Sequence, residues 1–182
     1  MTRIALFDTT ELTDSSTRAK ELLDATKRQL GRIPNLYSSM AQSPTALEAY
    51  LSFRAVLIKG VLSTQMMERI ALLTAAVNDC AYCVSAHSFR GAKIGMSESD
   101  LAATQKAQSD NAKDQTALQF VVTLIEQRGQ IPDNDYAVLK ASGWSDEEIG
   151  EIVAHVALNV FSNYFNHVAQ PELDFPLVAV AR

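Results

Sequence analysis

Residues 145–164 read SDEEIGEIVAHVALNVFSNY and carry the clearest folding signal in the sequence. Ser145 is followed three residues later by Glu148, the capping-box arrangement in which each side chain satisfies the backbone amide of the other residue. Apolar residues then return every three or four positions and predict one helical face of about four turns. These residues are Ile149, Ile152, Val153, Val156, Ala157, Val160, Phe161 and Tyr164. Such a face must pack against other helices.

The same signals recur along the rest of the chain. There are only 7 glycines and 5 prolines in 182 residues, which favours helices nearly throughout. Ser43 before Pro44 is a typical helix start, and Gly60 is expected to be a C-cap. The predicted helices cover residues 16–30, 44–59, 64–78, 79–93, 97–101, 114–127, 132–143 and 145–164, with a turn at 33–35. No linker or repeat divides them, so the sequence predicts a single all-α domain over residues 1–182.

The composition is typical of a soluble globular protein. The 21 acidic and 16 basic residues give a net charge of -5 at pH 7, which is not the basic footprint of a nucleic-acid-binding protein. Apolar runs such as residues 70–73 are far shorter than the roughly 20 residues needed to cross a membrane. Residues 1–8 lack the features of a secretory signal, so we expect a cytoplasmic protein.

Cys80 and Cys83 are the only cysteines, so a disulfide framework does not stabilise this fold. In a reducing compartment such a pair is more often catalytic or metal-binding than structural. On a helix, Cys83 lies about 60° and His87 about 20° from Cys80, so the three share one face. Cys83 and His87 are at i and i+4, where the imidazole can take the thiol proton.

The expected start of this helix also bears on the thiols. With Asp79 as the N-cap, the first turn would stabilise a thiolate through its free amides and its positive dipole end. The Asp79 carboxylate would oppose this effect if it faced the sulfurs. The residues themselves also leave open which cysteine attacks, because the first thiol of many CxxC pairs is the more acidic one.

Glu68 is expected to contact His87. It precedes Asp79 by 11 residues and His87 follows by 8. In an antiparallel helix pair this mismatch is about 4.5 Å, which a glutamate side chain can span. A carboxylate there would orient the imidazole and stabilise the imidazolium.

Glu68 followed by Cys80-x-Tyr82-Cys83-x-x-x-His87 resembles the AhpD-type alkylhydroperoxidases of the carboxymuconolactone decarboxylase superfamily. The combination is specific, whereas CxxC alone is weak. Further matches to the peroxidase-related branch are Gly31-x-Ile33-Pro34-Asn35, Ser43-Pro44, Gly60-x-Leu62-Ser63, Asn163-Tyr164-Phe165-Asn166-His167 and Asp174-x-Pro176. The resemblance extends from about residue 25 to residue 176.

This resemblance implies a helical, oligomerising thiol peroxidase that needs no metal or other cofactor. Cys83 would attack hydrogen peroxide or an organic hydroperoxide, and Cys80 would resolve the sulfenic acid. His87 would be the base and Glu68 its partner. A dithiol or a lipoyl-bearing protein would be the reductant. The best-known members have histidine at the position of Tyr82, whose pKa of about 10 makes it a poor proton shuttle, so a shorter relay is expected.

Two other interpretations concern the cysteine pair. The thiols could be small buried hydrophobic side chains, or they could bind zinc together with His87. Structural zinc usually requires a fourth ligand, and the remaining histidines, His155 and His167, lack a recognised spacing.

Outside the cysteine motif, three residues have structural expectations. His155 is expected to be a hydrogen-bonded core or interface residue. For Asn166 and His167 we expect helix capping or subunit contact. The alternative functions are a carboxymuconolactone decarboxylase-like activity, whose branch uses no cysteine pair, and a non-catalytic redox-sensing or zinc-binding module.

Overall fold

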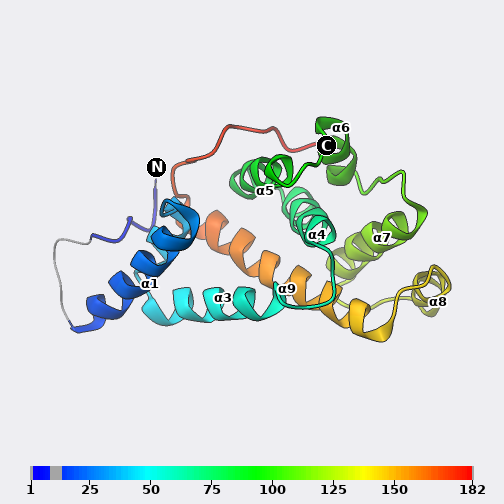
Figure 1. Cartoon of the computed structure of the whole chain (residues 1–182), viewed down its shortest axis with the longest axis horizontal. Helices are drawn as coiled ribbons and strands as arrows, with labels where there is room; N and C mark the ends of the chain where they lie inside the picture. Colours follow the sequence, from blue (N-terminus) through cyan, green and yellow to red (C-terminus); the bar gives the residue numbers. More distant parts are fainter. Residues whose placement is uncertain (1, 9–13, 182) are drawn as a thin grey trace.

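The structure, a computed structural model, describes residues 2–8 and 14–181. These residues form nine α-helices and no β-strand, which confirms the predicted all-α fold (Figure 1). In chain order they are α1 (Asp14–Leu30), α2 (Asn35–Met40), α3 (Pro44–Leu57), α4 (Thr64–Val77), α5 (Ala81–Lys93), α6 (Glu98–Gln105), α7 (Ala112–Glu126), α8 (Asp133–Ala141) and α9 (Asp146–Ala169).

Four helices have a serine as their N-cap, and the sequence predicts two of these serines, Ser43 and Ser145, as helix starts. Each serine side chain accepts a hydrogen bond from the backbone amide three residues further on. The four are Ser43, Ser63, Ser97 and Ser145. The capping box predicted for Ser145 and Glu148 is confirmed. A second box, formed by Ser97 and Asp100, opens α6.

The prediction of a turn at residues 33–35 was incomplete, because α2 begins at Asn35. Pro34 is its N-cap residue, and no side chain caps the helix. Five of its six residues are nevertheless buried. Burial against the rest of the protein, which the local sequence does not reveal, is what stabilises this short helix.

Gly60 is not the predicted left-handed C-cap. Helix α3 already ends at Leu57, and Gly60 is absent from the glycines with positive φ. A side chain at Gly60 would collide with the carboxylate of Glu151. That carboxylate accepts hydrogen bonds from the amides of Val61 and Leu62, at 2.9 to 3.1 Å. Gly60 therefore leaves room for the Glu151 side chain of α9 to contact the loop between α3 and α4, and it does not end a helix.

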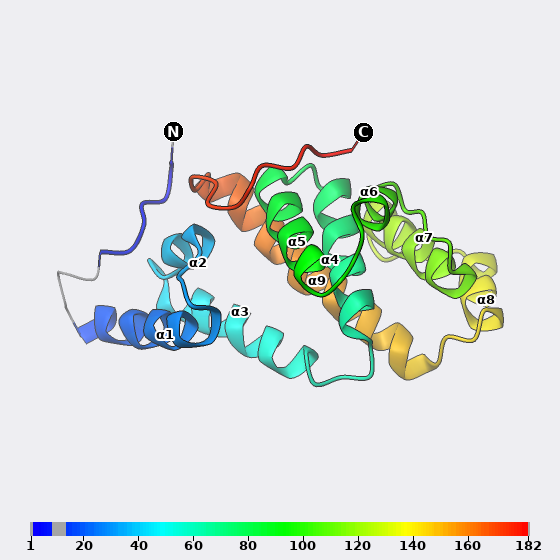
Figure 2. The ribbon, with the colours of Figure 1, turned by 45° about the horizontal axis from the view of Figure 1, so that its top comes forward.

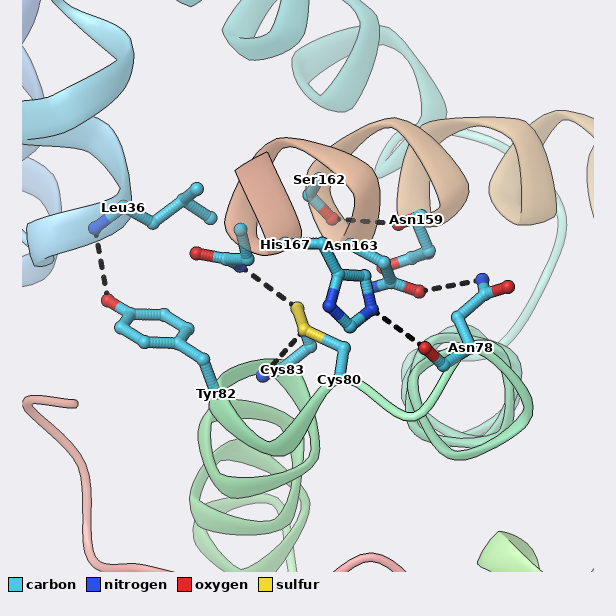
Figure 3. The surroundings of a disulfide bond; sticks show 10 residues. Leu36, Asn78, Cys80, Tyr82, Cys83, Asn159, Ser162, Asn163 and His167 are labelled. Atoms are coloured by element: carbon cyan, nitrogen blue, oxygen red, sulfur yellow. Dashed lines mark hydrogen bonds between the residues drawn. A yellow bond between two sulfur atoms is a disulfide. The ribbon is translucent and has the colours of Figure 1, made fainter. Parts of the chain in front are cut away.

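Helix α9 buries only part of the predicted apolar face, and Val153 in its first half is already 41% exposed. Ile149, Ile152 and Val156 are buried, but Phe161 is 40% and Tyr164 58% exposed. The buried side of the second half is polar. It carries Asn159, Ser162, Asn163 and Asn166. This polar row faces the start of α5, where the cysteines lie (Figure 3).

Helix α4 occupies the centre of the molecule and contacts α5, α6, α7 and α9. Helix α9 runs along the length of the molecule, from α8 to α2 (Figures 1 and 2). The apolar core has two clusters, one that includes Cys80 and Cys83 and one between α4, α7 and α9. None of the described helices is long and apolar enough to span a membrane.

Residues 171–181 form an extended segment that returns over α5 toward α6 (Figure 2). The amide of Val178 donates a hydrogen bond to Ser85 Oγ at 3.0 Å. The amide of Ala181 donates to Gln105 Oε1 at 2.9 Å. The segment thus covers the cysteine-bearing helix.

Candidate active site

Cys80 and Cys83 form a disulfide at the start of α5, with their Cα atoms 5.3 Å apart (Figure 3). Cys80, rather than Asp79 as predicted, is the N-cap, and its sulfur accepts a hydrogen bond from the amide of Cys83 at 3.4 Å. Asp79 has a φ of 53°. This left-handed conformation, which aspartate tolerates, closes the turn after α4 and is incompatible with the extended backbone of an N-cap.

Asn166 contacts the cysteine pair from α9. Its Nδ2 donates a hydrogen bond to Cys83 Sγ at 3.0 Å, and its Oδ1 is buried without a hydrogen-bond partner. The expectation that Asn166 serves capping or subunit contact was therefore wrong. The residue places a fixed donor at one sulfur of the pair, a role that its position near the end of α9 did not suggest.

The turn before α5 is attached to α9 by two further bonds (Figure 3). Asn78 Nδ2 donates to Asn163 Oδ1 at 3.0 Å. The Nε2–H of His167 donates to the carbonyl oxygen of Asn78 at 2.8 Å. Since Asn78 is the C-cap of α4, His167 does cap a helix end, although the helix is α4 rather than α9.

The predicted contact between Glu68 and His87 is confirmed. Glu68 lies on α4 and His87 on α5, and His87 Nδ1 is 2.7 Å from Glu68 Oε2. Both side chains are largely buried, with 17% and 9% of their surfaces exposed. A hydrogen bond from Nδ1–H to the carboxylate leaves Nε2 as the basic nitrogen of a neutral ring.

Burial and neighbouring charges set the protonation of this pair. Burial raises the pKa of Glu68, but the charges of His87, Arg90 and Arg54 outweigh it and lower that pKa to about 2. Burial, helped by Arg90, lowers the pKa of His87, and the Glu68 carboxylate only partly opposes this. The pair therefore consists of a carboxylate and a neutral imidazole at neutral pH, as a proton acceptor requires.

Tyr82, between the cysteines, is anchored away from this pair. Its hydroxyl donates to Asp174 Oδ1 at 2.6 Å and accepts from the amide of Leu36 at 3.1 Å. Burial, and next the hydrogen bond to Asp174, raise its pKa above the usual value. Tyr82 thus joins α2, α5 and the C-terminal segment.

A cavity of about 280 Å³ reaches Cys83 and His87, which both line it. Cys80 is not among its lining residues. Most of the wall is aromatic or aliphatic, and the cavity also meets cationic side chains. Its aromatic residues are Tyr37, Tyr50, Tyr82, Phe89 and Phe175, and its cations are Arg32, Arg90 and Lys93. The geometry therefore presents the sulfur of Cys83 and the imidazole to one hollow.

A second cavity, of about 170 Å³, lies against the same histidine. Glu68, His87 and Arg90 line it, together with His155 from α9. His155 is 4% exposed, so the expectation of a core residue is confirmed, but its Nε2 is buried without a hydrogen-bond partner. Within residues 2–8 and 14–181, no three histidine, cysteine or acidic side chains are grouped as metal ligands would be.

Sequence reasoning missed Arg90 and Asn166. For Arg90 a signal existed, because it follows Cys83 by seven residues and therefore returns to within about 20° of the same helix face. For Asn166 the signal was weaker. The second half of α9 alternates asparagine and serine with large apolar residues, and only the packing shows which set is buried.

Comparisons with known proteins support a family assignment. The sequence pattern of the Carboxymuconolactone decarboxylase family matches residues 44–121. These residues include Glu68, Cys80, Cys83 and His87. No curated protein matches the chain.

Several solved structures share the fold. An uncharacterized peroxidase-related protein from Silicibacter sp. TM1040 has a TM-score of 0.79 and 19% identity, covering 93% of this chain and 92% of that one. The alkylhydroperoxidase AhpD core of an uncharacterized peroxidase-related protein from Ralstonia eutropha JMP134 has a TM-score of 0.78 and 21% identity, covering 96% and 94%. The debrominase Bmp8, as a cysteine-to-alanine variant in complex with 2,3,4-tribromopyrrole, has a TM-score of 0.79 and 18% identity, covering 96% and 92%.

At such identities the structural likeness establishes the fold alone, and the sequence pattern adds a match to the family over residues 44–121. The match includes the two helices that carry the glutamate, the cysteine pair and the histidine. The chain therefore has the AhpD-like fold, and its residues 44–121 match the Carboxymuconolactone decarboxylase family.

Proposed function

We propose that the protein is a thiol peroxidase that reduces hydrogen peroxide or organic hydroperoxides through Cys80 and Cys83. One observation carries the proposal. Cys83 lines the same cavity as His87, and His87 Nδ1 is hydrogen-bonded to the buried Glu68 carboxylate. A nucleophile, a base and a group that orients the base are thus gathered at one hollow.

In the reduced protein, His87 Nε2 takes the proton of the Cys83 thiol. The thiolate, which Asn166 Nδ2 stabilises, attacks one peroxide oxygen. A sulfur–oxygen bond forms as the oxygen–oxygen bond breaks, and two electrons pass from sulfur to the peroxide. The leaving hydroxide or alkoxide takes the proton from the His87 imidazolium and departs as water or alcohol. Cys83 is left as a sulfenic acid.

Cys80 then closes the cycle. Its sulfur attacks Cys83, so that a disulfide forms while the bond between Cys83 and the hydroxyl breaks. The hydroxyl leaves as water with the proton of the Cys80 thiol. An external dithiol, for example on a lipoyl-bearing protein, reduces the disulfide by exchange. This cycle uses the two cysteines and needs no metal or other cofactor.

Two further parts of the proposal concern the setting. A dithiol cycle of this kind suits a reducing compartment, so we place the protein in the cytoplasm. We also propose a homo-oligomer. Its support is the exposure of apolar residues on α3 and α9, including Val56 at 69% and Val168 at 59%. Light scattering of the purified protein would test it.

The cysteine roles are tested by single variants treated with one equivalent of peroxide. Cys80→Ser should accumulate a sulfenic acid at Cys83, which dimedone traps and mass spectrometry locates. Cys83→Ser should neither consume peroxide nor bind dimedone, and both should lose turnover with a dithiol. Dimedone on Cys80 in the Cys83→Ser variant, together with continued peroxide consumption, would reverse the roles.

A second candidate is reductive debromination of an aromatic ring. The five aromatic side chains of the cavity favour it, since they could hold such a ring. Cys83 would take bromine from carbon as the carbon gains a proton, and Cys80 would then displace bromide to form the disulfide. Bromide release from a bromopyrrole, measured with a dithiol, would separate this reaction from peroxide reduction. Turnover of a carboxylactone without thiols would instead indicate the decarboxylase alternative.

A further inference from the structure

Arg90 is a half-buried cation that forms no ion pair with a described residue. It lies in the last turn of α5. Its Nε is buried and makes no hydrogen bond. Within the described part of the chain, no side chain accepts a hydrogen bond from it or forms an ion pair with it. The Glu68 charge acts on it from a distance, but that carboxylate is hydrogen-bonded to His87.

A guanidinium in this position is costly. It stays protonated at any physiological pH, and removing a charge from water is unfavourable unless an opposite charge or hydrogen-bond acceptors replace the water. Around Arg90 the structure supplies the Glu68 charge at a distance, but no hydrogen-bond acceptor for its buried Nε. A group that is both planar and anionic would satisfy it best, because the guanidinium fork matches a carboxylate in two parallel hydrogen bonds.

The cavity beside Arg90 is positively charged, as a binding site for an anion requires. Among the described residues, no aspartate or glutamate lines it. Two further cations stand among its walls, each over an aromatic ring. The guanidinium of Arg32 lies 4.4 Å from the ring centre of Phe175, and Lys93 Nζ lies 4.5 Å from that of Phe89. Arg32 is already paired with Asp174 and Lys93 lies over the Phe89 ring, whereas Arg90 has a buried Nε without a hydrogen-bond partner.

The rest of the cavity selects for size and apolarity. Its volume of about 280 Å³ is nearly twice the ~150 Å³ that accepts one benzene molecule. Tyr37, Tyr50 and Phe89 contribute flat apolar walls. An aromatic ring with a short branched substituent therefore fits, whereas a long acyl chain does not.

We propose that this cavity binds small organic acids, with the carboxylate on Arg90, an aromatic or branched apolar body against the tyrosine and phenylalanine walls, and the reducible group toward Cys83. The last element rests on the proposed function. It specifies the peroxide as an organic hydroperoxide that carries a carboxylate. Binding of the acid itself does not depend on any reaction at the cysteines.

The first test uses the unaltered disulfide protein and two unreactive probes of nearly equal shape. 4-Isopropylbenzoate and its neutral amide, 4-isopropylbenzamide, are titrated by isothermal calorimetry. We expect the acid to bind roughly tenfold or more tightly, as a charge-assisted bidentate pair predicts. Equal affinities, or no binding of either probe, would overturn the proposal.

Variants assign the preference to one residue. Arg90→Gln should abolish the difference between the two probes, and Arg90→Lys should keep part of it. Arg54→Gln is the matched control, since Arg54 lines the second cavity but not the first. An equal loss in Arg54→Gln would mean that affinity follows net charge, and the assignment would fail. If Arg90→Gln does not fold, the probe comparison on the unaltered protein still decides.

Turnover separates this inference from the proposed function. Cumene hydroperoxide and its 4-carboxylate derivative share the reacting group and the ring. We expect kcat/KM to favour the carboxylate by roughly tenfold, and Arg90→Gln to remove that preference. Acid binding without any turnover would support the acid-binding site at Arg90 and contradict the proposed peroxidase function. Turnover of both hydroperoxides at equal rates, with no acid binding, would support the peroxidase function and contradict the acid-binding site at Arg90.

Discussion

Asn166 donates a hydrogen bond to the sulfur of Cys83, and no comparable side-chain donor contacts Cys80, which accepts a backbone amide instead. A neutral amide donor stabilises an anionic sulfur more than a neutral one, so this contact lowers a thiol pKa. The asymmetry favours Cys83 as the thiolate. The sequence alone had left the choice between the two cysteines open.

Replacing Asn166 with alanine should therefore slow the alkylation of reduced Cys83 at neutral pH several-fold, because a hydrogen bond to the thiolate is removed. The pH dependence of iodoacetamide alkylation measures this in a Cys80→Ser background, where a single thiol titrates. Asn159→Ala is the matched control. Asn159 is also buried on α9, but it donates to the carbonyl of His155. An unchanged alkylation profile in Asn166→Ala would show that the amide has no such effect.

Glu68 should make the stability of the protein depend on acid pH. Its pKa of about 2 lies below the usual 4.5, so the ionised carboxylate stabilises the folded state above pH 4.5, and this contribution is lost as the pH falls toward 2. Glu68→Gln should lower the free energy of unfolding by on the order of 2–3 kcal/mol at pH 7, with a difference that shrinks toward pH 2.

Urea unfolding at pH 3, 4.5 and 7 measures this difference. Glu48→Gln is the control, since Glu48 forms an exposed ion pair with Arg18, and we expect a much smaller change from it. A Glu68→Gln difference that stays constant from pH 7 to pH 3 would contradict the assigned ionisation.

The residues of the site were predictable to the extent that helical spacing places them. Cys83 and His87 are one turn apart, and Glu68 follows from an antiparallel helix pair. Asn166 is 83 residues from the sulfur it contacts. Its role depends on which face of α9 is buried, and an isolated helix pattern does not determine that.

At the scale of elements, helix starts were more predictable than helix ends. A serine cap is a local contact between residues three apart, so it can be read from sequence. The role of Gly60 depends on a distant helix instead, because the carboxylate of Glu151 on α9 occupies the space beside it. Asp79 shows that a helix start can also be mispredicted when the surrounding chain decides the backbone conformation. It resembled an N-cap locally, but the turn from α4 to α5 requires its left-handed backbone.

The pair Gly60 and Gly150 tests this interpretation. Gly60→Ala should destabilise the protein by on the order of 1–2 kcal/mol, because the new methyl group displaces the Glu151 carboxylate from the Val61 and Leu62 amides. Gly150 is an exposed residue within α9 with open space around it. Gly150→Ala should therefore stabilise by about 0.5–1 kcal/mol.

Thermal unfolding followed by circular dichroism measures both effects. In a Glu151→Ala background, the cost of Gly60→Ala should largely vanish, since the obstructing carboxylate is gone. A full cost in that background would place the strain in the backbone of Gly60 itself.

For the molecule as a whole, the sequence predicted one helical domain but not how its last extended segment closes the site. Asp174 accepts hydrogen bonds from the Tyr82 hydroxyl at 2.6 Å and the Asn35 amide at 3.0 Å, and it pairs with Arg32. Phe175, the next residue, lines the cavity. One carboxylate thus holds together the start of α2, the helix of the cysteines and the wall of the cavity.

Asp174→Ala should lower the free energy of unfolding by on the order of 2 kcal/mol, since three donors lose their common acceptor. It should also speed hydrogen exchange in residues 171–181 and at the start of α2, because both depend on this contact. Glu172→Ala is the control, as the Glu172 side chain is exposed and only its carbonyl bonds to Asn35. Faster exchange confined to residues 171–181, with α2 still protected, would mean that the segment lies on the molecule without holding the entrance of the cavity together.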